Sequence, residues 1–451
     1  MFAVFNALTL VLSVTFVTYI FLIFVPYIRH KPTQEGYAGD FSWHFFIPCR
    51  DEAAVVATTI TRARERFPEA HVWVIDDDSD DDTLAIAQSF ERNDDHVHVV
   101  SRRRPDARIG KGAALNAAYE KLNSWLPAGA DRSRVIVNVV DADGEVAENA
   151  LRMVASRTVF GDPNIGAAQI AVWMKNRNDR RPLPGKGYLA NQVGRFLIRM
   201  QDLEFRTAIG AMQALRARTG TVSLGGNGQF TRLSILDMVG AQYGSPWHGS
   251  LLEDYELGIH IVLAGGTTVH VYETHVSQEA LPSFRRLLAQ RTRWAQGNID
   301  CIRYIPQIIR SPHVDAAGVL ESCYYLLLPY LQITGITSLV LVGVSTIWKV
   351  FLDPGALTLY LSTSWATVIL FFFFSIAPFA MWGPVYRRKA EPQTSPALAV
   401  GYGILYWLYI YYMLLVTPRA FYRTITKKRG WAKTRRNAEV VAKGGKVALE
   451  E

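Results

Sequence analysis

Cysteine is scarce in this chain of 451 residues, where only Cys49, Cys301 and Cys323 occur and no two share a Cys-x-x-Cys spacing. Disulfide scaffolds, zinc ribbons and iron–sulfur sites are therefore excluded. The sequence also lacks a Gly-x-Gly-x-x-Gly turn after its first expected strand, and it has no P-loop, His-Glu-x-x-His or Gly-x-Ser-x-Gly motif. Dinucleotide-binding, P-loop, zinc-protease and serine-hydrolase sites thus find no support.

The composition indicates a protein of mixed character. Apolar residues make up 49% of the chain and charged residues 20%, with a mean hydropathy of +0.08. This balance is too apolar for a disordered chain and too charged for one wholly buried in a membrane, so we expect a soluble part joined to membrane helices. The basic excess behind the net charge of +8 gathers beside the apolar stretches. We therefore expect it to meet anionic lipid head groups rather than nucleic acid.

The first apolar stretch, residues 2–27, carries no charged side chain. As a helix it reaches roughly 39 Å, which is enough to cross a hydrocarbon core of about 30 Å. It lacks the charged start and the small-residue cleavage site of a signal peptide, so we expect a retained transmembrane helix over 1–30. Arg29 and Lys31 follow at once, which predicts a cytoplasmic location for that end.

Three further apolar stretches, at about 317–348, 356–383 and 397–418, predict C-terminal transmembrane helices within 316–418. The basic residues 387–389 and the basic tail 419–451 favour the cytoplasm. Three full crossings from a cytoplasmic domain would leave the tail outside, so either one segment is re-entrant or interfacial, or the charge rule fails here. We expect a multi-pass protein of the plasma membrane with a cytoplasmic catalytic domain.

Short strand-like and helix-like segments alternate between residues 37 and 280. Helices are expected at 52–67 and 111–126, and strands at 43–48, 71–76, 96–100 and 135–141. This alternation predicts an α/β domain with a largely parallel sheet. Ligands of such sheets bind beyond the carboxyl ends of the strands.

Two of the expected strands end in acidic residues. One leads into Asp76, Asp77 and Asp78, and another leads into Asp141 and Asp143. Clustered carboxylates repel one another unless a cation or hydrogen-bond donors compensate, and Asp-x-Asp at a strand end suits Mg²⁺ or Mn²⁺. The alternative, a solvated turn that caps a helix, stays open for residues 80–83.

Taken in order, these segments resemble the membrane-embedded, inverting family 2 glycosyltransferases, namely the cellulose, chitin and hyaluronan synthases and their bacterial relatives. The motifs that carry the resemblance are Ile-Pro-Cys-Arg-Asp-Glu (47–52), Val-Ile-Asp-Asp (74–77), Gly-Lys-Gly-Ala-Ala-Leu-Asn (110–116), Asp-Ala-Asp (141–143), Gly-Gly-Asn-Gly (225–228), Leu-Glu-Asp (252–254) and Gln-Arg-Thr-Arg-Trp (290–294). The resemblance implies a GT-A (Rossmann-like) fold for a cytoplasmic glycosyltransferase domain over 37–280. It also implies that amphipathic interfacial helices over 281–315 carry the Gln-x-x-Arg-Trp motif of the processive branch.

The same resemblance assigns the residues that bind the donor. Asp77 would hold the uracil of a UDP-sugar, with Asp76 beside it. Asp141 would contact the nucleotide, and together with Asp143 it would bind Mg²⁺ or Mn²⁺ at the two phosphates. A divalent ion is therefore the expected cofactor.

Chemistry supports the roles that the resemblance gives to the reacting groups. Lys111 and Arg293 would place positive charge on the diphosphate as it leaves. Asp254, preceded by Glu253, would be the general base that takes the proton of the acceptor hydroxyl. A single displacement inverts the configuration, so an α-linked donor would yield a β-linked product. Seen alone, such an acidic pair is also common at a helix N-terminus.

The acceptor residues also follow from the resemblance. Trp294 would stack on the terminal sugar of the acceptor at the mouth of a channel, with Gln290 and Arg291 nearby. Seen alone, a Trp beside an Arg is more often plain packing. The segment 188–215 has apolar residues near helical spacing, which fits either another interfacial helix or a helix that faces the core.

Together these features predict a hexosyltransferase that polymerises a UDP-activated sugar, by default UDP-glucose, into a β-linked polysaccharide and secretes it through its own helices. The expected partners are the UDP-sugar, the growing polysaccharide and the lipid bilayer. Three helices are few for a channel, so a second copy or a partner subunit could contribute. The alternatives are a non-processive transferase that places one sugar on a lipid carrier and, more remotely, a membrane transport or scaffold protein.

Overall fold

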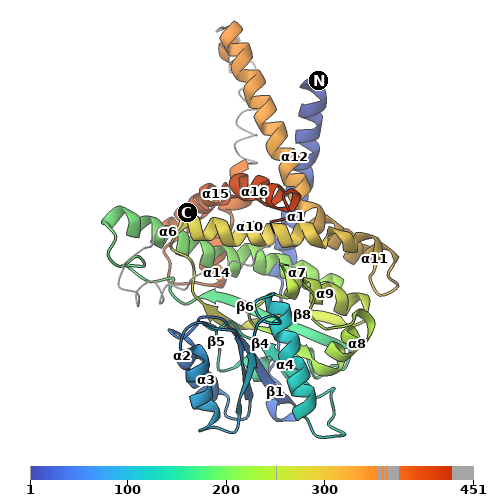
Figure 1. Ribbon diagram of the computed structural model, residues 1–451. Helices are drawn as coiled ribbons and strands as arrows, with labels where there is room; N and C mark the ends of the chain where they lie inside the picture. Colours follow the sequence, from blue (N-terminus) through green and yellow to red (C-terminus); the bar gives the residue numbers. More distant parts are fainter. Residues whose placement is uncertain are drawn as a thin grey trace.

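The computed structural model describes residues 2–249, 251–353 and 375–428, together with positions 355, 357–359 and 362. Most of the apolar stretch 356–383 and the tail beyond residue 428 lie outside the described residues. Figure 1 shows a sheet domain at one end of the molecule, from which helices α1 (Phe2–Ile28) and α12 (Ala316–Leu352) project.

An eight-stranded sheet forms the centre of the domain, with the strand order β3-β2-β1-β4-β7-β6-β8-β5. The strands are β1 (Ser42–Cys49), β2 (His71–Asp77), β3 (Val97–Arg102), β4 (Val135–Val139), β5 (Glu145–Val146), β6 (Ile165–Met174), β7 (Gln229–Arg232) and β8 (Thr267–Gln278). The four strands expected from the sequence are confirmed, and they pair in parallel as β3-β2-β1-β4. The sheet as a whole is mixed, because β7 is antiparallel to β4 and β6 and β5 is antiparallel to β8.

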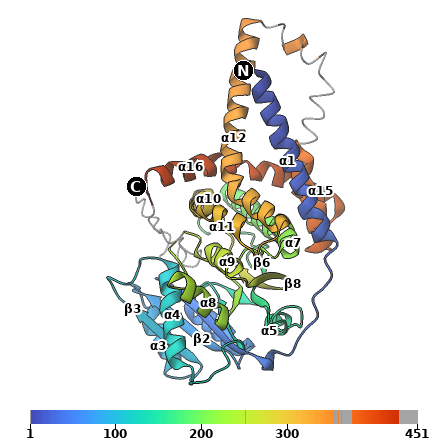
Figure 2. The same cartoon turned by 90° about the vertical axis from the view of Figure 1, so that its right-hand side faces the viewer.

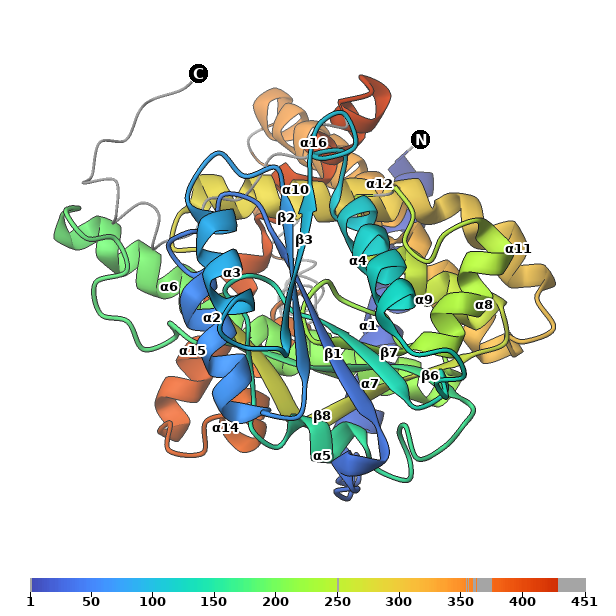
Figure 3. The same ribbon diagram turned by 60° about the horizontal axis from the view of Figure 1, so that its bottom comes forward.

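Helices cover both faces of the sheet (Figure 3), because alternate residues of each strand point to opposite sides. Phe45 and Ile47 of β1 join the core beneath α2 (Val56–Arg66), α3 (Thr83–Glu91) and α5 (Ala150–Val154). Phe46, between them, joins the core beneath α4 (Lys111–Trp125), α8 (Leu233–Tyr243) and α9 (Glu253–Leu263). Burial of each such side chain stabilises the fold by about 1.5–3 kcal/mol.

A layer of helices separates the sheet from the projecting α1 and α12. The segment expected to be helical at 188–215 forms α6 (Tyr188–Glu204) and the start of α7 (Gly210–Thr219), joined by a π-helical turn at Phe205–Ile209. The segment with the Gln-x-x-Arg-Trp motif forms α10 (Phe284–Cys301), a 3₁₀ turn at Ile302–Tyr304 and α11 (Ile305–Arg310). This layer places α10 directly over the carboxyl edge of the sheet (Figure 1).

In the part of the chain that the structure describes, three helical stretches are long and apolar enough to cross a membrane, namely Leu10–Ile28, Ala316–Leu352 and Pro396–Ile425. The third is broken into α15 (Pro396–Ile410) and α16 (Met413–Ile425), after α14 (Trp382–Lys389). Figures 1 and 2 show α15 and α16 lying across the base of α1 and α12 rather than beside them. Each of the two helices is shorter than the roughly 20 residues of a full crossing, whereas the stretch that they form together is longer. Helix α16 also extends into the segment expected to be a tail from residue 419.

Candidate active site

A cavity of about 590 Å³ is bordered by the carboxyl ends of β1 and β2, the loop after β4, and the helices α10, α12 and α16. Most of the predicted site residues line this cavity, namely Asp77, Lys111, Asp141, Glu253, Asp254, Gln290, Arg291, Arg293 and Trp294. The remaining two, Asp76 and Asp143, are buried behind its wall. The structure thus brings together motifs that are spread over more than two hundred residues of sequence.

Lys111, the first residue of α4, lies at the centre of the site. Its Nζ donates hydrogen bonds to Asp141 Oδ1 at 2.7 Å and to the Gly226 carbonyl at 2.6 Å. A Cβ at Gly226 would lie 2.9 Å from Lys111 Nζ and 3.1 Å from Asp254 Oδ2, so a side chain here would displace at least one of these charged groups. The ammonium and the Asp254 carboxylate are therefore at most about 6 Å apart. Three motifs of the sequence meet at this point.

The acidic pair that opens α9 is strongly affected by its surroundings. Burial raises the pKa of Glu253 to about 7, and the charge of Asp254 adds to the rise, whereas Lys111 opposes it. Burial also raises the pKa of Asp254 against the lowering effect of Lys111. Burial alone would lower the pKa of Lys111, but the charges of Asp141 and Glu253 outweigh it and raise that pKa. Carboxyl groups with raised pKa values suit proton transfer near neutral pH.

The aspartates at the end of β2 are paired with arginines from the end of β3 and from the loop that follows it. The Asp77 carboxylate accepts hydrogen bonds from the Arg102 guanidinium and, at 3.1 Å, from the Arg108 backbone N–H. Asp76 is fully buried and accepts from Arg103 Nη1 at 3.0 Å. Asp77 therefore faces the cavity as part of an ion pair. Asp76 is buried and accepts a hydrogen bond from the Ser79 N–H, which supports the turn after β2.

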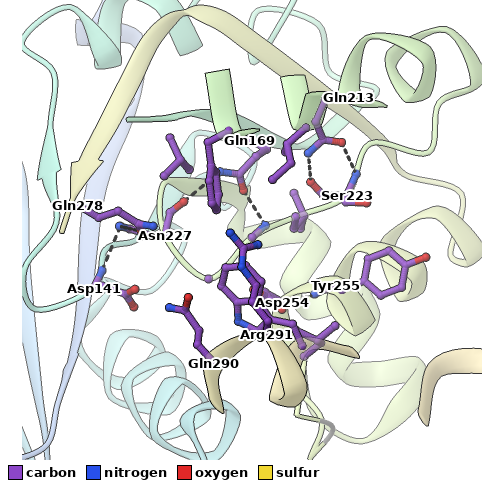
Figure 4. A pocket seen from close by; sticks show the side chains of 18 of the residues that line it. Asp141, Gln169, Gln213, Ser223, Asn227, Asp254, Tyr255, Gln278, Gln290 and Arg291 are labelled. Atoms are coloured by element: carbon purple, nitrogen blue, oxygen red, sulfur yellow. Dashed lines mark hydrogen bonds between the residues drawn. The ribbon is translucent and has the colours of Figure 1, made fainter. Parts of the chain in front are cut away.

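The Asp-Ala-Asp motif follows β4. The Asp141 backbone N–H donates to Asn227 Oδ1 at 3.2 Å, and Asn227 Nδ2 donates to Gln278 Oε1 at 3.0 Å (Figure 4). Asp143 accepts from the Glu279 backbone N–H at 3.3 Å. Among the described residues, no three His, Cys, Asp or Glu side chains are grouped to hold a metal. The oxygen donors of the motif nevertheless fit a hard divalent ion of the kind that takes one or two carboxylates and completes its shell with phosphates and water.

Helix α10 presents its motif to the cavity, with Gln290, Arg293 and Trp294 in the lining. Arg291 also borders it, but its guanidinium forms a buried ion pair with Glu204 of α6 and lies 4.5 Å from the centre of the Trp294 ring. Tyr412, which directly precedes α16, donates a hydrogen bond to the same carboxylate at 3.2 Å. Arg291 therefore borders the cavity with its guanidinium held in an ion pair.

A comparison with protein families assigns the class of this site. Residues 43–297, more than half of the chain, match the family described as "Glycosyltransferase like family 2". The chain belongs to glycosyltransferase family 2. The matched range includes every strand of the sheet and extends through the Gln-x-x-Arg-Trp motif of α10.

Curated relatives of this glycosyltransferase include enzymes named for lipid products. The beta-monoglucosyldiacylglycerol synthase of a Synechocystis species is 29% identical over 235 residues, which cover 52% of this chain and 42% of that protein. The polyprenol monophosphomannose synthase of Mycolicibacterium smegmatis is 30% identical over 155 residues, which cover 34% of this chain and 54% of that protein. The chain thus spans about half the length of these relatives.

A solved structure confirms the expected GT-A fold of this glycosyltransferase. The mannosyltransferase from Pyrobaculum calidifontis in complex with GDP-Man and Mn²⁺ aligns with a TM-score of 0.56 at 15% identity. The alignment covers 95% of this chain and 99% of the other. At this identity the likeness shows the fold alone.

Sequence reasoning missed a set of neutral residues in the cavity wall of this glycosyltransferase, namely Gln169, Gln213, Ser223, Asn227 and Gln278 (Figure 4). Gln169 Oε1 accepts from the Gly225 N–H at 2.7 Å and its Nε2 donates to the Asn227 carbonyl at 3.0 Å. Asn227 carried a signal, since it lies in the Gly-Gly-Asn-Gly motif. Single glutamines on strands and helices carry none.

Proposed function

We propose that this glycosyltransferase is an inverting hexosyltransferase that moves one sugar from a UDP-sugar to a membrane lipid. The observation that carries the proposal is the cavity, which joins the cluster of Lys111, Asp141 and Asp254 to the membrane-side helices α12 and α16. The names of the curated relatives support a lipid product. In this proposal α1 and α12 cross the plasma membrane and the catalytic domain lies on the cytoplasmic side.

The donor lies at the carboxyl edge of the sheet. Asp77 meets the uracil, and Asp141 contacts the nucleotide. Lys111 and Arg293 stabilise the negative charge that the departing diphosphate gains, because preplaced cations act where the transition state develops charge. A bound Mg²⁺ or Mn²⁺ at Asp141 and Asp143 would supply further Lewis acidity to the phosphates. UDP-glucose is the default donor.

Asp254 is the general base of the transfer. It takes the proton that a hydroxyl acceptor loses while the acceptor oxygen bonds to the anomeric carbon and the bond from that carbon to UDP breaks. Glu253 is the neighbouring buried carboxyl group, and the negative charge of the pair is distributed over both residues. Such proton transfer contributes about 10²–10⁴-fold to rate.

Processive synthesis of a β-linked polysaccharide is the second candidate. The observation that favours it is Trp294 in the cavity wall, where an aromatic ring suits the face of a sugar. The Arg291 guanidinium lies against that ring, however, and the two relatives described above are named for lipid products that carry one sugar. A second copy or a partner subunit would be needed only by this candidate.

The test is UDP release by the purified full chain in lipid vesicles, with a panel of nucleotide sugars and either Mg²⁺ or Mn²⁺. We expect one UDP-sugar to support release in the presence of lipid and a chelator to reduce it. Asp254→Asn should lower turnover by about 10²–10⁴-fold while UDP binding persists. Unchanged turnover in this variant would exclude Asp254 as the base, and no UDP release with any nucleotide sugar would favour a transport or scaffold protein.

A further inference from the structure

Helix α9 begins with Glu253 and Asp254, and a connecting segment leads into it from the end of α8 at Tyr243. The structure describes residues 244–249 and 251–252 of this segment. Because Glu253 and Asp254 are the first two residues of α9, their place depends on the backbone that precedes the helix. The contacts that hold this segment therefore bear on the base of the proposed reaction.

A side-chain amide of α4 binds the segment at Trp247. Asn116 Nδ2 donates to the Trp247 carbonyl at 2.7 Å, and the Trp247 N–H donates to Asn116 Oδ1 at 3.0 Å. The Trp247 carbonyl also accepts from Ser245 Oγ at 3.2 Å. Because an amide supplies a donor and an acceptor at once, Asn116 binds both backbone groups of one residue.

A glycine one turn earlier brings α4 close to the same segment. Gly112 and Asn116 are four residues apart, so they lie on one face of α4. A Cβ at Gly112 would lie 2.7 Å from the carbonyl oxygen of His248, which is a backbone atom. It would also lie 3.4 Å from Glu253 Cβ. The absence of a side chain thus lets the segment and the start of α9 pack directly on α4.

Helix α4 also carries the cation of the site. Lys111, its first residue, donates hydrogen bonds to Asp141 and to the Gly226 carbonyl. One helix therefore contacts both the proposed donor site and the segment that leads to the base. The distance between these two parts is important, because a displacement of about 1 Å can lower the rate of an enzyme by about 10²-fold.

From these contacts we infer that Asn116 is a positioning residue, which holds the segment before α9 so that the Asp254 carboxylate stays beside Lys111. The inference rests on the proposed function, because it concerns the placing of the base named there. Asn116 is not one of the described residues that border the cavity. It therefore acts on the reaction through Asp254 and not by contact with a substrate.

The first test is Asn116→Ala in the full chain in vesicles, with the nucleotide sugar that supports UDP release. The variant loses both hydrogen bonds to Trp247 and keeps the charged groups of the donor site. We expect kcat to fall by about 10–10²-fold, whereas KM for the donor and Kd for UDP change by less than about threefold. A normal kcat would overturn the inference.

Asn123→Ala is the matched control on the same helix. Asn123 Oδ1 accepts a hydrogen bond from Arg132 Nη2 at 2.6 Å, so this variant also removes an amide contact of α4 but leaves the segment before α9 unchanged. Its kcat should equal that of the unmodified chain. An equal loss in both variants would show a general weakening of α4 and would overturn the inference.

A double-mutant cycle shows whether Asn116 acts through Asp254. In the Asp254→Asn chain the base is already absent, so the addition of Asn116→Ala should change the remaining turnover by less than about threefold. A further loss of about tenfold or more in that chain would assign Asn116 to another task and overturn the inference.

Gly112→Ala tests the same contact without loss of a hydrogen-bonding group, and it decides the matter if Asn116→Ala does not fold. Alanine favours a helix more than glycine does, so α4 itself should persist, while the added Cβ meets the His248 carbonyl. We expect the same fall in kcat, and a normal kcat would overturn the inference.

The variants separate failure of this inference from failure of the proposed function. If Asp254→Asn loses turnover while Asn116→Ala and Gly112→Ala keep it, the inference alone is wrong. If Asp254→Asn keeps full turnover, the proposed base is wrong and the inference fails with it.

Discussion

Gly226 lies beside two charged groups that perform different tasks. Lys111 Nζ donates to the Gly226 carbonyl, and both Lys111 Nζ and Asp254 Oδ2 lie close to the place that a Cβ of residue 226 would occupy. The contact between the Gly-Lys-Gly, Gly-Gly-Asn-Gly and Leu-Glu-Asp motifs depends on the absence of a side chain here. Residue types at this site could be predicted from the motifs, because each task demands a particular functional group. The contact itself could not, because it arises only when α4, α9 and the loop before β7 come together.

A methyl group at position 226 should displace Lys111 or Asp254 from its place in the site. In Gly226→Ala the added Cβ would lie 2.9 Å from Lys111 Nζ and 3.1 Å from Asp254 Oδ2, so one of them must move. We expect kcat to fall at least tenfold in the UDP-release assay with little change in the thermal midpoint. Gly225→Ala is the matched control, because its Cβ would meet only the Gln169 side chain at ordinary contact distance, 3.5 Å. Equal activity of the two variants would contradict the geometry.

The acidic pair predicts a pH dependence of activity. Burial raises the pKa of Glu253 to about 7 and also raises the pKa of Asp254, so the pair takes up a proton as the pH falls through this range. The base is active only as a carboxylate and its own pKa is raised by burial, so kcat/KM should decline as the pH falls on the acid side of neutrality, by up to tenfold per pH unit. Glu253→Gln should move the inflection to lower pH, because Asp254 then has one negative neighbour fewer. A flat profile between about pH 5.5 and 8 would be inconsistent with this assignment.

At the scale of elements, prediction succeeded where a segment carries its own periodic signal. The buried strands β1, β2 and β4 could be located because short, nearly continuous apolar runs specify them locally, and the helix α4 because it follows the Gly-Lys-Gly motif with helix-forming residues. The break between α15 and α16 could not, because Tyr411 and Tyr412 carry no helix-breaking signal and the stretch is apolar throughout. The partner of Arg291 was equally hidden, since Glu204 is 87 residues away in α6.

The pair of Arg291 and Glu204 joins α10 to α6 and should support the structure more than it binds substrate. Both side chains are buried, so Arg291→Met leaves an uncompensated carboxylate and should cost about 3–5 kcal/mol of unfolding free energy. Thermal unfolding of the detergent-solubilised chain measures the loss. The double variant Arg291→Met/Glu204→Gln should recover much of it. A single variant of normal stability with a raised KM for the acceptor would instead assign Arg291 to binding.

At the scale of the whole molecule, one cavity extends from the carboxyl edge of the sheet, where we propose that the donor binds, to the helices α12 and α16 on the proposed membrane side. Figure 2 shows α1 and α12 projecting together, with α15 and α16 lying across their base. Residues of α12 and α16 border the cavity, and the two helices are joined by the hydrogen bond from Thr417 Oγ1 to Gln332 Oε1 at 3.0 Å.

The size of the product tests the central claim, a single transfer to a lipid, most directly. The purified full chain is reconstituted in vesicles, supplied with excess labelled UDP-sugar and followed until UDP release stops. Mass spectrometry of the total products should then show lipid carrying one sugar, with one UDP released per lipid glycosylated. A ladder of products with many sugars, formed while most of the lipid stays unmodified, would contradict the account and restore polysaccharide synthesis.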